Sequence, residues 1–385
     1  MRAVQQFQRD NGLTPDGVVG PATWLVFEKF LRGYDIYTIQ PGDTLYGIAR
    51  RYYTSLNAIL TANPGINPNR LFAGQQVVVP YGIPVVFTDI DYTYDILERN
   101  IRGLKARYPF IETGIAGKSV MGKNLYYLRL GTGTNQVFYN GAHHANEWIT
   151  TPLLMKFIEN FSRAYSTGSN IRGYNVRDIW NKSSIYIVPM VNPDGVDLVL
   201  YWPRYSNPVY TRAAQLNTSG LPLPRVWKAN ISGVDLNVNY PAEWQKEKDL
   251  EIAQGITGPA PRDYGGPAPL SEPESSSVVN FTRSHNFRLV IAYHTQGEVI
   301  FWQFENLAPP DALPIARQFS RASGYAISEN PYESAYAGFK DWFIQDYRRP
   351  GYTIEVGRGI NPIPISQFNS IYNKNEEIML LATLV

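Results

Sequence analysis

The chain has no cysteine and only four histidines among its 385 residues. Without cysteine it forms neither a disulfide nor a thiolate metal site, so histidine, aspartate and glutamate must supply the ligands of any transition metal. Charge of one sign is not in excess, because the formal net charge is +2. Arginines are paired at 50–51 and 348–349 without forming a longer basic block. We therefore expect no nucleic-acid partner.

Long apolar runs are also missing from the sequence. No stretch of 18 apolar residues is present, so the sequence predicts neither a membrane span nor a membrane partner. The N-terminal segment MRAVQQFQRDNG lacks the apolar core of a secretory signal. A chain of 385 residues exceeds one ordinary domain, so we expect one large unit with small attachments.

Three segments follow one another along the chain. Residues 1–32 predict a helix end, a turn marked by glycine and proline, and a second helix from Pro21. Residues 34–81 predict a β-α-α-β unit that begins with YDIYTIQ and ends with QQVVVP. From about residue 90 to residue 385, strands alternate with helices, which is typical of an α/β fold with a mixed sheet flanked by helices. The expected strands of this segment include NLYYLRLG, QVFYNGA, SSIYIVPMV, FRLVIAYH and GYTIEVG.

The segment HHANE, residues 143–147, lies between the buried strand QVFYNGA and a helix with apolar residues from Leu153 to Phe161. A polar surface loop, in which one histidine caps that helix, is the alternative interpretation. The pair nevertheless follows the carboxyl end of a strand, where open α/β sheets bind their ligands.

Two further strands end in a titratable residue. His294 ends FRLVIAYH, and Glu355 ends YTIE, where a carboxylate is costly unless it is paired or used. Three strand ends therefore converge, and we expect His144, Glu147 and His294 to bind one zinc ion per chain. Glu355 is then the general base beside the metal-bound water.

Several motifs occur in one order: HHANEWIT, NPDG at 192–195, GVDLN at 233–237, AYH, and TIEVG. With these motifs, residues 90–385 resemble the zinc carboxypeptidases of the carboxypeptidase A type. The resemblance implies a zinc-dependent peptidase with the same three ligands and the same base. It also makes Asp235 the acceptor that orients a ligand imidazole, and Asn237 a substrate-binding residue. No role follows for His143, which we expect to cap a helix.

The departures from the family pattern are informative. An arginine that grips the terminal carboxylate of the substrate is replaced by Val238, which cannot form such a pair. A second arginine, which polarises the scissile carbonyl, is replaced by Lys228 in RVWKAN. Lysine still stabilises an oxyanion as a point charge, although a surface lysine beside a packed tryptophan is the alternative. The phenol near the leaving amine aligns best with Tyr332 and less well with Tyr336.

The segments WKAN, GVDLNVNYPAEW, HTQGEVIFW, AGFKDWF and EVGRGINP resemble one branch of the family, the γ-D-glutamyl-L-meso-diaminopimelate peptidases of bacterial walls. The substrate implied is the stem peptide of peptidoglycan. Lys340 then pairs with the distal carboxylate of diaminopimelate, and Arg358 with the free α-carboxylate of D-Glu. For both residues an ordinary solvated charge is the alternative. A general metallocarboxypeptidase and a catalytically silent wall-binding protein are the competing functions; the second should have lost a ligand or the base.

The N-terminal segments resemble wall-binding modules. YTIQPGDTLYGIARRYYTSLNAILTANPGINPNRLFAGQQVVVP resembles a LysM module over its whole length, which implies binding of N-acetylglucosamine-containing glycans such as peptidoglycan. A βααβ module that only adds stability is the alternative. FQRDNGLTPDGVVGPATW resembles the second half of a peptidoglycan-binding domain. We therefore expect a protein that is associated with the cell wall, or secreted if a leader has been removed, and otherwise cytoplasmic or spore-associated.

Overall fold

The computed structural model describes residues 1–204, 206–328 and 336–385. These residues form two compact units, one of residues 1–87 and 95–111 and the other of residues 88–94 and 112–385. The helices in the described ranges include none that is both long and apolar enough to cross a membrane.

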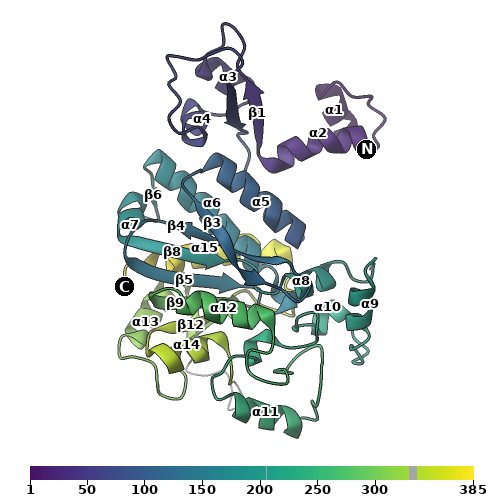
Figure 1. Ribbon diagram of the computed structural model, residues 1–385, viewed down its shortest axis with the longest axis vertical. Coiled ribbons are helices and arrows are strands. Elements are labelled where there is room, and N and C mark those ends of the chain that lie inside the picture. Colours follow the sequence, from purple (N-terminus) through teal and green to yellow (C-terminus); the bar gives the residue numbers. More distant parts are fainter. Residues whose placement is uncertain (205, 329–335) are drawn as a thin grey trace. The chain divides into compact units, whose positions relative to one another are not determined.

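The large unit is built on one mixed sheet of eight strands (Figure 1). The strand order is β11-β10-β12-β9-β5-β8-β4-β3, in which β12, β9, β5 and β8 run parallel. The outer strands β3, β4 and β10 add antiparallel pairs. The strand bounds are β3 Glu112–Lys118, β4 Asn124–Leu130, β5 Asn135–Gly141, β8 Ser183–Val188, β9 Phe287–His294, β10 Val299–Phe301, β11 Ala326–Ser328 and β12 Gly351–Glu355. A two-stranded hairpin is formed by β6 Asn170–Ile171 and β7 Tyr174–Asn175.

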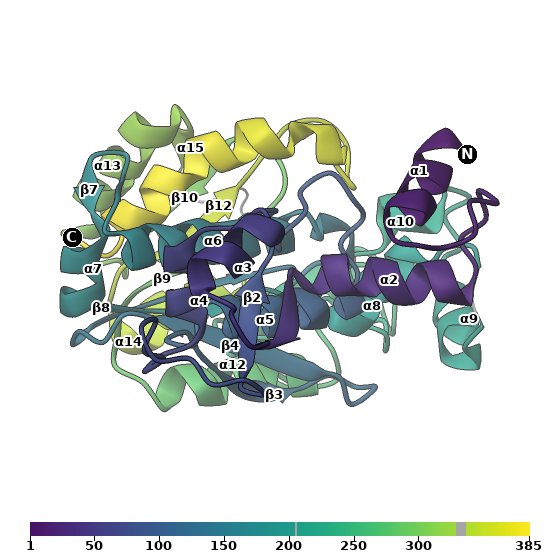
Figure 2. The same ribbon diagram turned by 90° about the horizontal axis from the view of Figure 1, so that it is seen from above.

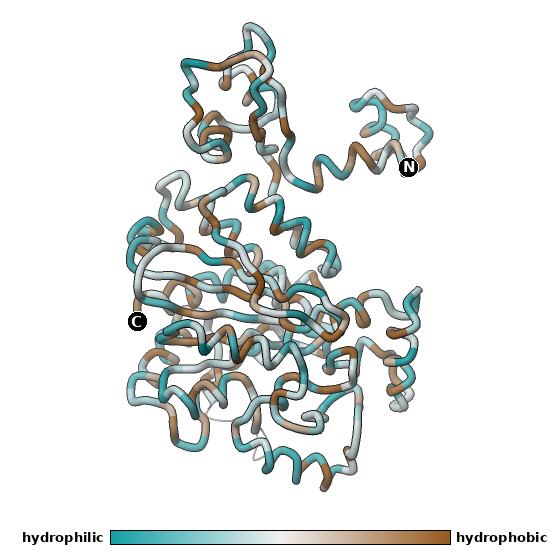
Figure 3. Tube along the Cα trace, in the orientation of Figure 1, coloured by the Kyte–Doolittle hydropathy of each residue, from teal (hydrophilic) through white to brown (hydrophobic). Residues whose placement is uncertain are grey.

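Helices cover both faces of this sheet, as the view from above shows (Figure 2). The helices α12 and α14 lie on one face, and α6 and α15 lie on the other. In Figure 3 hydrophilic and hydrophobic colours alternate along these helices, as expected where one side of a helix packs on a core. The helix bounds are α6 Thr150–Thr167, α7 Val176–Lys182, α8 Pro193–Leu200, α9 Pro208–Ala214, α10 Leu223–Val226, α11 Trp244–Ala253, α12 Pro273–Arg283, α13 Ala312–Ser323, α14 Phe339–Tyr347 and α15 Phe368–Leu381. Three 3-10 turns complete the unit: η1 Ala145–Glu147, η2 Leu236–Val238 and η3 Ile365–Gln367.

Successive residues of β5 face opposite cores, because side chains alternate along a strand. The Phe138 ring lies 5.0 Å from the ring of Phe287 and 5.7 Å from that of Phe339 on α14. The next residue, Tyr139, donates its hydroxyl to the carbonyl of Met379 on α15 at 2.7 Å. Both side chains are fully buried. A strand buried on both faces explains the continuous apolar runs of the sequence, and the predicted fold class is confirmed.

The small unit contains the predicted β-α-α-β arrangement. Strand β1 (Tyr34–Thr38) pairs antiparallel with β2 (Gln76–Pro80), and α3 (Leu45–Arg51) and α4 (Leu56–Ala62) connect them. Thr44 and Ser55 cap the two helices by accepting backbone N–H groups. Two helices, α1 (Arg2–Asp10) and α2 (Pro21–Arg32), precede this module.

A further helix, α5 (Tyr94–Arg107), belongs to the small unit over most of its length. The guanidinium of Arg107 donates to the carbonyls of Gly33 at 2.6 Å and Tyr81 at 2.9 Å. Asn100 donates to the carbonyl of Val85 at 2.8 Å. We predicted a division near residue 90, which would place this helix in the large unit, whereas the compact units place most of it in the small one. The predicted segments 1–32, 34–81 and 90–385 stay a prediction.

Candidate active site

The first two candidate ligands come from the turn between β5 and α6. Ala142 has a left-handed φ of 53°, which turns the chain sharply after the strand. Thr150 secures the turn, because its hydroxyl accepts the N–H of Ala142 at 2.8 Å and donates to the carbonyl of Glu147 at 2.8 Å. Ala145–Glu147 form a 3-10 turn. Side chains three residues apart eclipse in such a turn, so the spacing of His144 and Glu147 directs both to one side.

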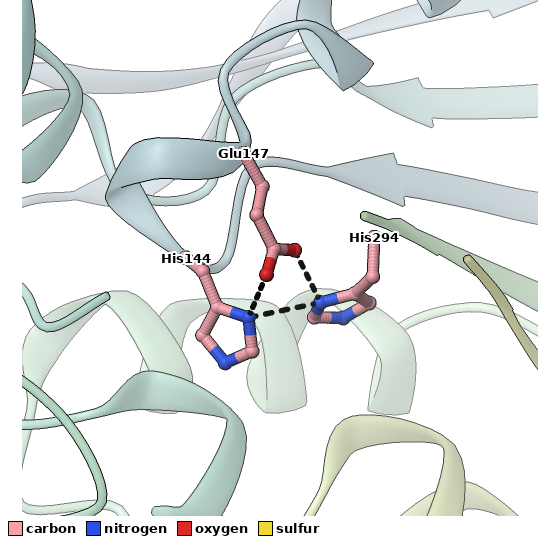
Figure 4. Close-up of side chains that lie close together, drawn as sticks. All are labelled: His144, Glu147 and His294. Carbon is pink, nitrogen blue, oxygen red and sulfur yellow. Dashed lines mark hydrogen bonds and ion pairs between the residues drawn. The ribbon is translucent and has the colours of Figure 1, made fainter. Parts of the chain in front are cut away.

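The third candidate comes from the neighbouring strand β9. Its register pairs Tyr293 with Gly141, so His294 lies beside the start of the β5–α6 turn. The Nδ1 atom of His144 lies 2.9 Å from Oε1 of Glu147, and Nδ1 of His294 lies 3.0 Å from Oε2 (Figure 4). The two Nδ1 atoms are 3.2 Å apart. Three buried donor groups therefore point at one place.

These distances fit a zinc ion. Ligands that bind zinc tetrahedrally at about 2.0–2.1 Å are separated from one another by roughly 3.3 Å, close to the distances between the three donors. The charge fits as well. Burial alone would lower the pKa of His144, but the carboxylates of Glu147 and Asp235 raise it to about 9. The same negative environment attracts a metal cation.

Groups around the ligands hold them in place. Asp235 accepts from His144, with Oδ1 3.1 Å from Nε2, as the sequence analysis expects of the residue that orients a ligand imidazole. The backbone N–H of Thr295 donates to Oε2 of Glu147 at 3.1 Å, and the amide of Asn361 donates to Oε1 at 3.3 Å. Both carboxylate oxygens of Glu147 are therefore oriented by the protein.

Glu355 lies at the carboxyl end of β12, and its Cα pairs in register with that of His294. Burial, with a smaller contribution from the negative charge of Glu147, raises the pKa of Glu355 to about 8. Its Oε2 atom is buried without a hydrogen-bond partner among the described residues. A carboxyl group with a raised pKa beside a metal site is suited to exchanging a proton with a substrate.

Lys228 brings a positive charge to the same place. Its Nζ atom lies 3.6 Å from Oε1 of Glu147. Burial disfavours the charged ammonium, yet the carboxylates of Glu147 and Asp235 raise the pKa of Lys228. Lys228 and Glu355 both line a cleft of about 580 Å³. Lys228 is therefore part of the site, and the alternative of a surface lysine away from it is not favoured.

The predicted substrate residues lie in different surroundings. Asn237 accepts the N–H of Phe339 through Oδ1 at 3.2 Å, so its side chain is fixed at the start of α14. Lys340 is only 5% exposed, and it donates to the carbonyl of Gln303 at 2.8 Å and pairs with Asp341. Its ammonium already has an anionic partner, so these contacts give no support to the predicted pair with diaminopimelate.

Arg358 also has a partner within the protein. Its guanidinium lies 2.6 Å from Oε2 of Glu298, and its side chain is 76% exposed. The predicted contact with D-Glu therefore stays a prediction. Tyr332 lies outside the described residues. The second candidate, Tyr336, packs its ring 6.3 Å from that of Phe304 and lies under the ammonium of Lys246 at 5.2 Å.

The prediction that His143 caps a helix is wrong. His143 is fully buried, and its Nε2 lies 2.8 Å from the hydroxyl of Tyr240. Its ring packs 5.8 Å from the ring of Phe339 and 5.7 Å from that of His294. Burial keeps the pKa of His143 well below its usual value, so the imidazole is neutral and supports the wall of the site. The sequence pattern could not reveal that His143 is buried, because a histidine that caps a helix and a buried histidine can both follow a strand.

Several residues that line the cleft were not predicted from the sequence, among them Asn361, Arg225 and Arg262. Arg225 precedes Lys228 by three positions, and Arg262 lies in the loop GPAPRDYGG. Arg225 belongs to the short helix α10, and four residues are too few to show a period. Arg262 belongs to a loop, which carries no periodic signal, and only the folded chain brings the two segments together.

Together, the fold and the His-Glu-His donor set define a metallopeptidase with a partly buried glutamate beside the metal site. The zinc carboxypeptidase family model matches residues 97–378, which is most of the chain, and the chain belongs to this family. Zinc is accordingly the cofactor. A LysM domain model matches residues 37–80, and a peptidoglycan-binding domain model matches residues 1–26.

Named relatives extend over the same range. The chain is 43% identical to the gamma-D-glutamyl-L-diamino acid endopeptidase 1 of Lysinibacillus sphaericus over 89% of its own length and 98% of that protein. It is 36% identical to the uncharacterized protein YqgT of Bacillus subtilis (strain 168), over 75% of its length and 76% of that protein. In structure it is similar to bovine thrombin-activatable fibrinolysis inhibitor, with a TM-score of 0.60 and 20% identity over 77% of this chain and 97% of the other. The structural likeness bears on the fold alone.

Proposed function

We propose that the chain is an endopeptidase that hydrolyses the bond between γ-D-glutamyl and meso-diaminopimelate in the stem peptides of peptidoglycan. The relative that is 43% identical carries the name of a γ-D-glutamyl-L-diamino acid endopeptidase. The LysM and peptidoglycan-binding modules support a substrate in the bacterial wall. A catalytically silent wall-binding protein is not favoured, because the three ligands and Glu355 are all present.

The observation that carries this proposal is Val238, which follows Asn237 in the turn Leu236–Val238. A valine offers no charge to a terminal carboxylate. A general carboxypeptidase depends on recognising that carboxylate, whereas an endopeptidase accepts a peptide that continues beyond the scissile bond. The geometry therefore favours cleavage within the stem over removal of a terminal residue.

Bound zinc supplies a Lewis acid that polarises a carbonyl oxygen and makes water acidic enough to react near neutral pH. Glu355 accepts the proton of the attacking water and returns it to the leaving amine. The positive charge of Lys228 opposes the rise in the pKa of Glu355 and so favours the carboxylate form that accepts the proton. Lys228 also stabilises the negative charge that develops on the carbonyl oxygen, while Asp235 holds His144.

The test uses the peptide L-Ala-γ-D-Glu-meso-diaminopimelate with its α-carboxylate at the L-centre either free or amidated. The proposal predicts kcat/KM values within about threefold of each other, because no cation at position 238 reads that carboxylate. A carboxypeptidase would lose at least ~100-fold on amidation, since its buried cation would be left unpaired. Such a loss would overturn the proposal, and so would a failure to cut either peptide.

We also propose N-acetylglucosamine-containing glycan strands as the ligand of residues 37–80. The LysM match supports this ligand class, and the two wall-binding modules support a location in contact with the cell wall. Secretion and association with spores stay predictions. Binding to chitin oligosaccharides, measured by calorimetry on the full chain, tests the ligand class; heat of binding equal to that of a cellulose oligosaccharide control would contradict it.

A further inference from the structure

The cleft beside the metal site has an unequal distribution of charge. Its titratable lining residues are Arg225, Lys228, Arg262 and Glu355. Three are cations and one is an acid, so the lining is positive on balance. A cleft lined by one sign of charge concentrates ligands of the opposite sign. This cleft is therefore suited to a substrate that carries a carboxylate close to the scissile bond.

The three cations differ in how far the protein already satisfies them. Lys228 faces Glu147 at 3.6 Å. Arg262 bonds Oδ2 of Asp263 at 2.7 Å through Nε, and its terminal Nη atoms have no partner among the described residues. Arg225 is exposed and has no ion pair within the described part of the chain. Guanidinium groups bind a carboxylate by two parallel hydrogen bonds, for which Arg262 retains both Nη atoms.

We propose that Arg262, assisted by Arg225, binds the free α-carboxylate of the γ-linked D-glutamyl residue and so selects the γ-glutamyl bond. This inference rests on the proposed function. A γ-linkage places the α-carboxylate four bonds from the scissile carbonyl carbon, at most ~5 Å away for bonds of about 1.5 Å. An α-linked peptide presents a carboxylate at that separation only where the residue before the scissile bond is itself glutamate.

The position of the cleft supports this assignment. The scissile carbonyl must be reached by Glu355 and Lys228, and both share the cleft with Arg262. Arg262 lies close enough to Lys228 for its positive charge to oppose the rise in the pKa of Lys228 that the carboxylates cause. Lys340 and Arg358, the residues expected from the sequence to bind carboxylates, use terminal nitrogens in ion pairs with Asp341 and Glu298. Arg262 instead uses only Nε for its pair with Asp263. Arg262 is therefore a better candidate than either residue.

The experiment compares two substrates that differ in one group: a γ-D-glutamyl-meso-diaminopimelate peptide and its D-isoglutaminyl form, in which the α-carboxylate is a carboxamide. The wild-type enzyme should prefer the carboxylate by at least ~10-fold in kcat/KM, equivalent to ~1.4 kcal/mol. Arg262→Gln should reduce this preference to about twofold or less, because kcat/KM should fall much more for the carboxylate than for the carboxamide. Arg225→Gln should reduce the preference in part.

Arg321→Gln serves as the matched control, because Arg321 is an exposed arginine in the last turn of α13 and does not line the cleft. An equal loss on both substrates in Arg262→Gln would indicate a structural role and overturn the inference. Loss of the preference in Arg358→Gln instead would assign the carboxylate to Arg358. Should Arg262→Gln fail to fold, the test rests on Arg225→Gln. An unchanged preference of this variant for the carboxylate over the carboxamide would overturn the site formed by the two arginines. If the wild type cuts neither peptide, the proposed function itself fails.

Discussion

The Nε2 atom of His144 lies 3.1 Å from Oδ1 of Asp235, on the side of the imidazole opposite the Nδ1 atom that faces Glu147 and His294. When a metal takes the place of the proton on Nδ1, Nε2 keeps its proton and donates it to Asp235, so the aspartate would fix the orientation of the ring toward the metal. The pKa of Asp235 is lowered despite its burial, chiefly by the positive charge on His144, so the residue remains an acceptor. The sequence motif GVDLN is thus tied to the metal site through one hydrogen bond.

Asp235→Asn should weaken zinc binding by ~10- to 100-fold, because the neutral amide orients the imidazole less strongly. Competition with a chromogenic chelator measures the affinity. Asp249→Asn, which changes an exposed aspartate of α11, is the matched control and should bind zinc as the wild type does. Equal affinities in the two variants would show that Asp235 does not support the ligand.

Glu355→Gln should lower kcat by ~10²-fold or more, since an amide cannot accept the proton of the attacking water. The variant should retain one zinc ion per chain, because Glu355 is not among the three converging donor residues. Metal analysis and stopped assays on the same sample provide both measurements. Loss of zinc together with activity would make Glu355 a ligand, and near-normal kcat would place the base elsewhere.

Removing residues 1–82 should weaken co-sedimentation with insoluble peptidoglycan and leave kcat/KM on a soluble stem peptide nearly unchanged. The metal ligands and Glu355 all belong to the large unit, and tethering acts only through the effective concentration near the wall. The truncated chain should have a lower Tm, because Arg107 loses the carbonyl acceptors of Gly33 and Tyr81. Full-length Glu355→Gln is the control, because it should bind insoluble peptidoglycan without hydrolysing it. Unchanged sedimentation after truncation would mean that the small unit does not anchor the enzyme.

The raised pKa of Glu274 should make the free energy of unfolding depend on pH. Glu274 is fully buried, and burial raises its pKa from 4.5 to about 7, so the folded chain holds this proton more tightly than the unfolded chain. The resulting stabilisation is complete below pH 4.5 and is lost as the pH rises through 7. It amounts to roughly 3 kcal/mol. In Glu274→Gln the free energy of unfolding should fall less between pH 5 and pH 8 than in the wild type, as measured by urea titration. Parallel curves would contradict the assignment.

The fold could be predicted largely because its central strands are buried on both faces. The apolar runs ending at Gly141, His294 and Glu355 marked three strand ends, and the register of the parallel strands brings them together. The short strands β10 and β11 at one end of the sheet were not predicted, because three residues are too few to show a period.

The charged residues of the cleft were harder to predict. Lys340 and Arg358 were predicted as carboxylate-binding residues from the family resemblance. Asp341, the partner of Lys340, directly follows it in the sequence, but a neighbour in the sequence is not necessarily a partner in the fold. Glu298 precedes Arg358 by 60 positions, so the sequence near Arg358 could not predict that pair. Arg262 comes from a loop 34 positions after Lys228, and only tertiary structure unites them. Metal ligands can be predicted because their spacing is constrained by a turn, whereas ion pairs between distant loops are not constrained in this way.

Purified muropeptides that carry meso-diaminopimelate, digested by the enzyme and analysed by mass, show which bond is cut. We expect fragments that end in D-Glu, together with free diaminopimelate or a peptide that begins with it, and none of these products with Glu355→Gln. Release of single C-terminal alanines with the D-Glu–diaminopimelate bond intact would contradict the proposed endopeptidase.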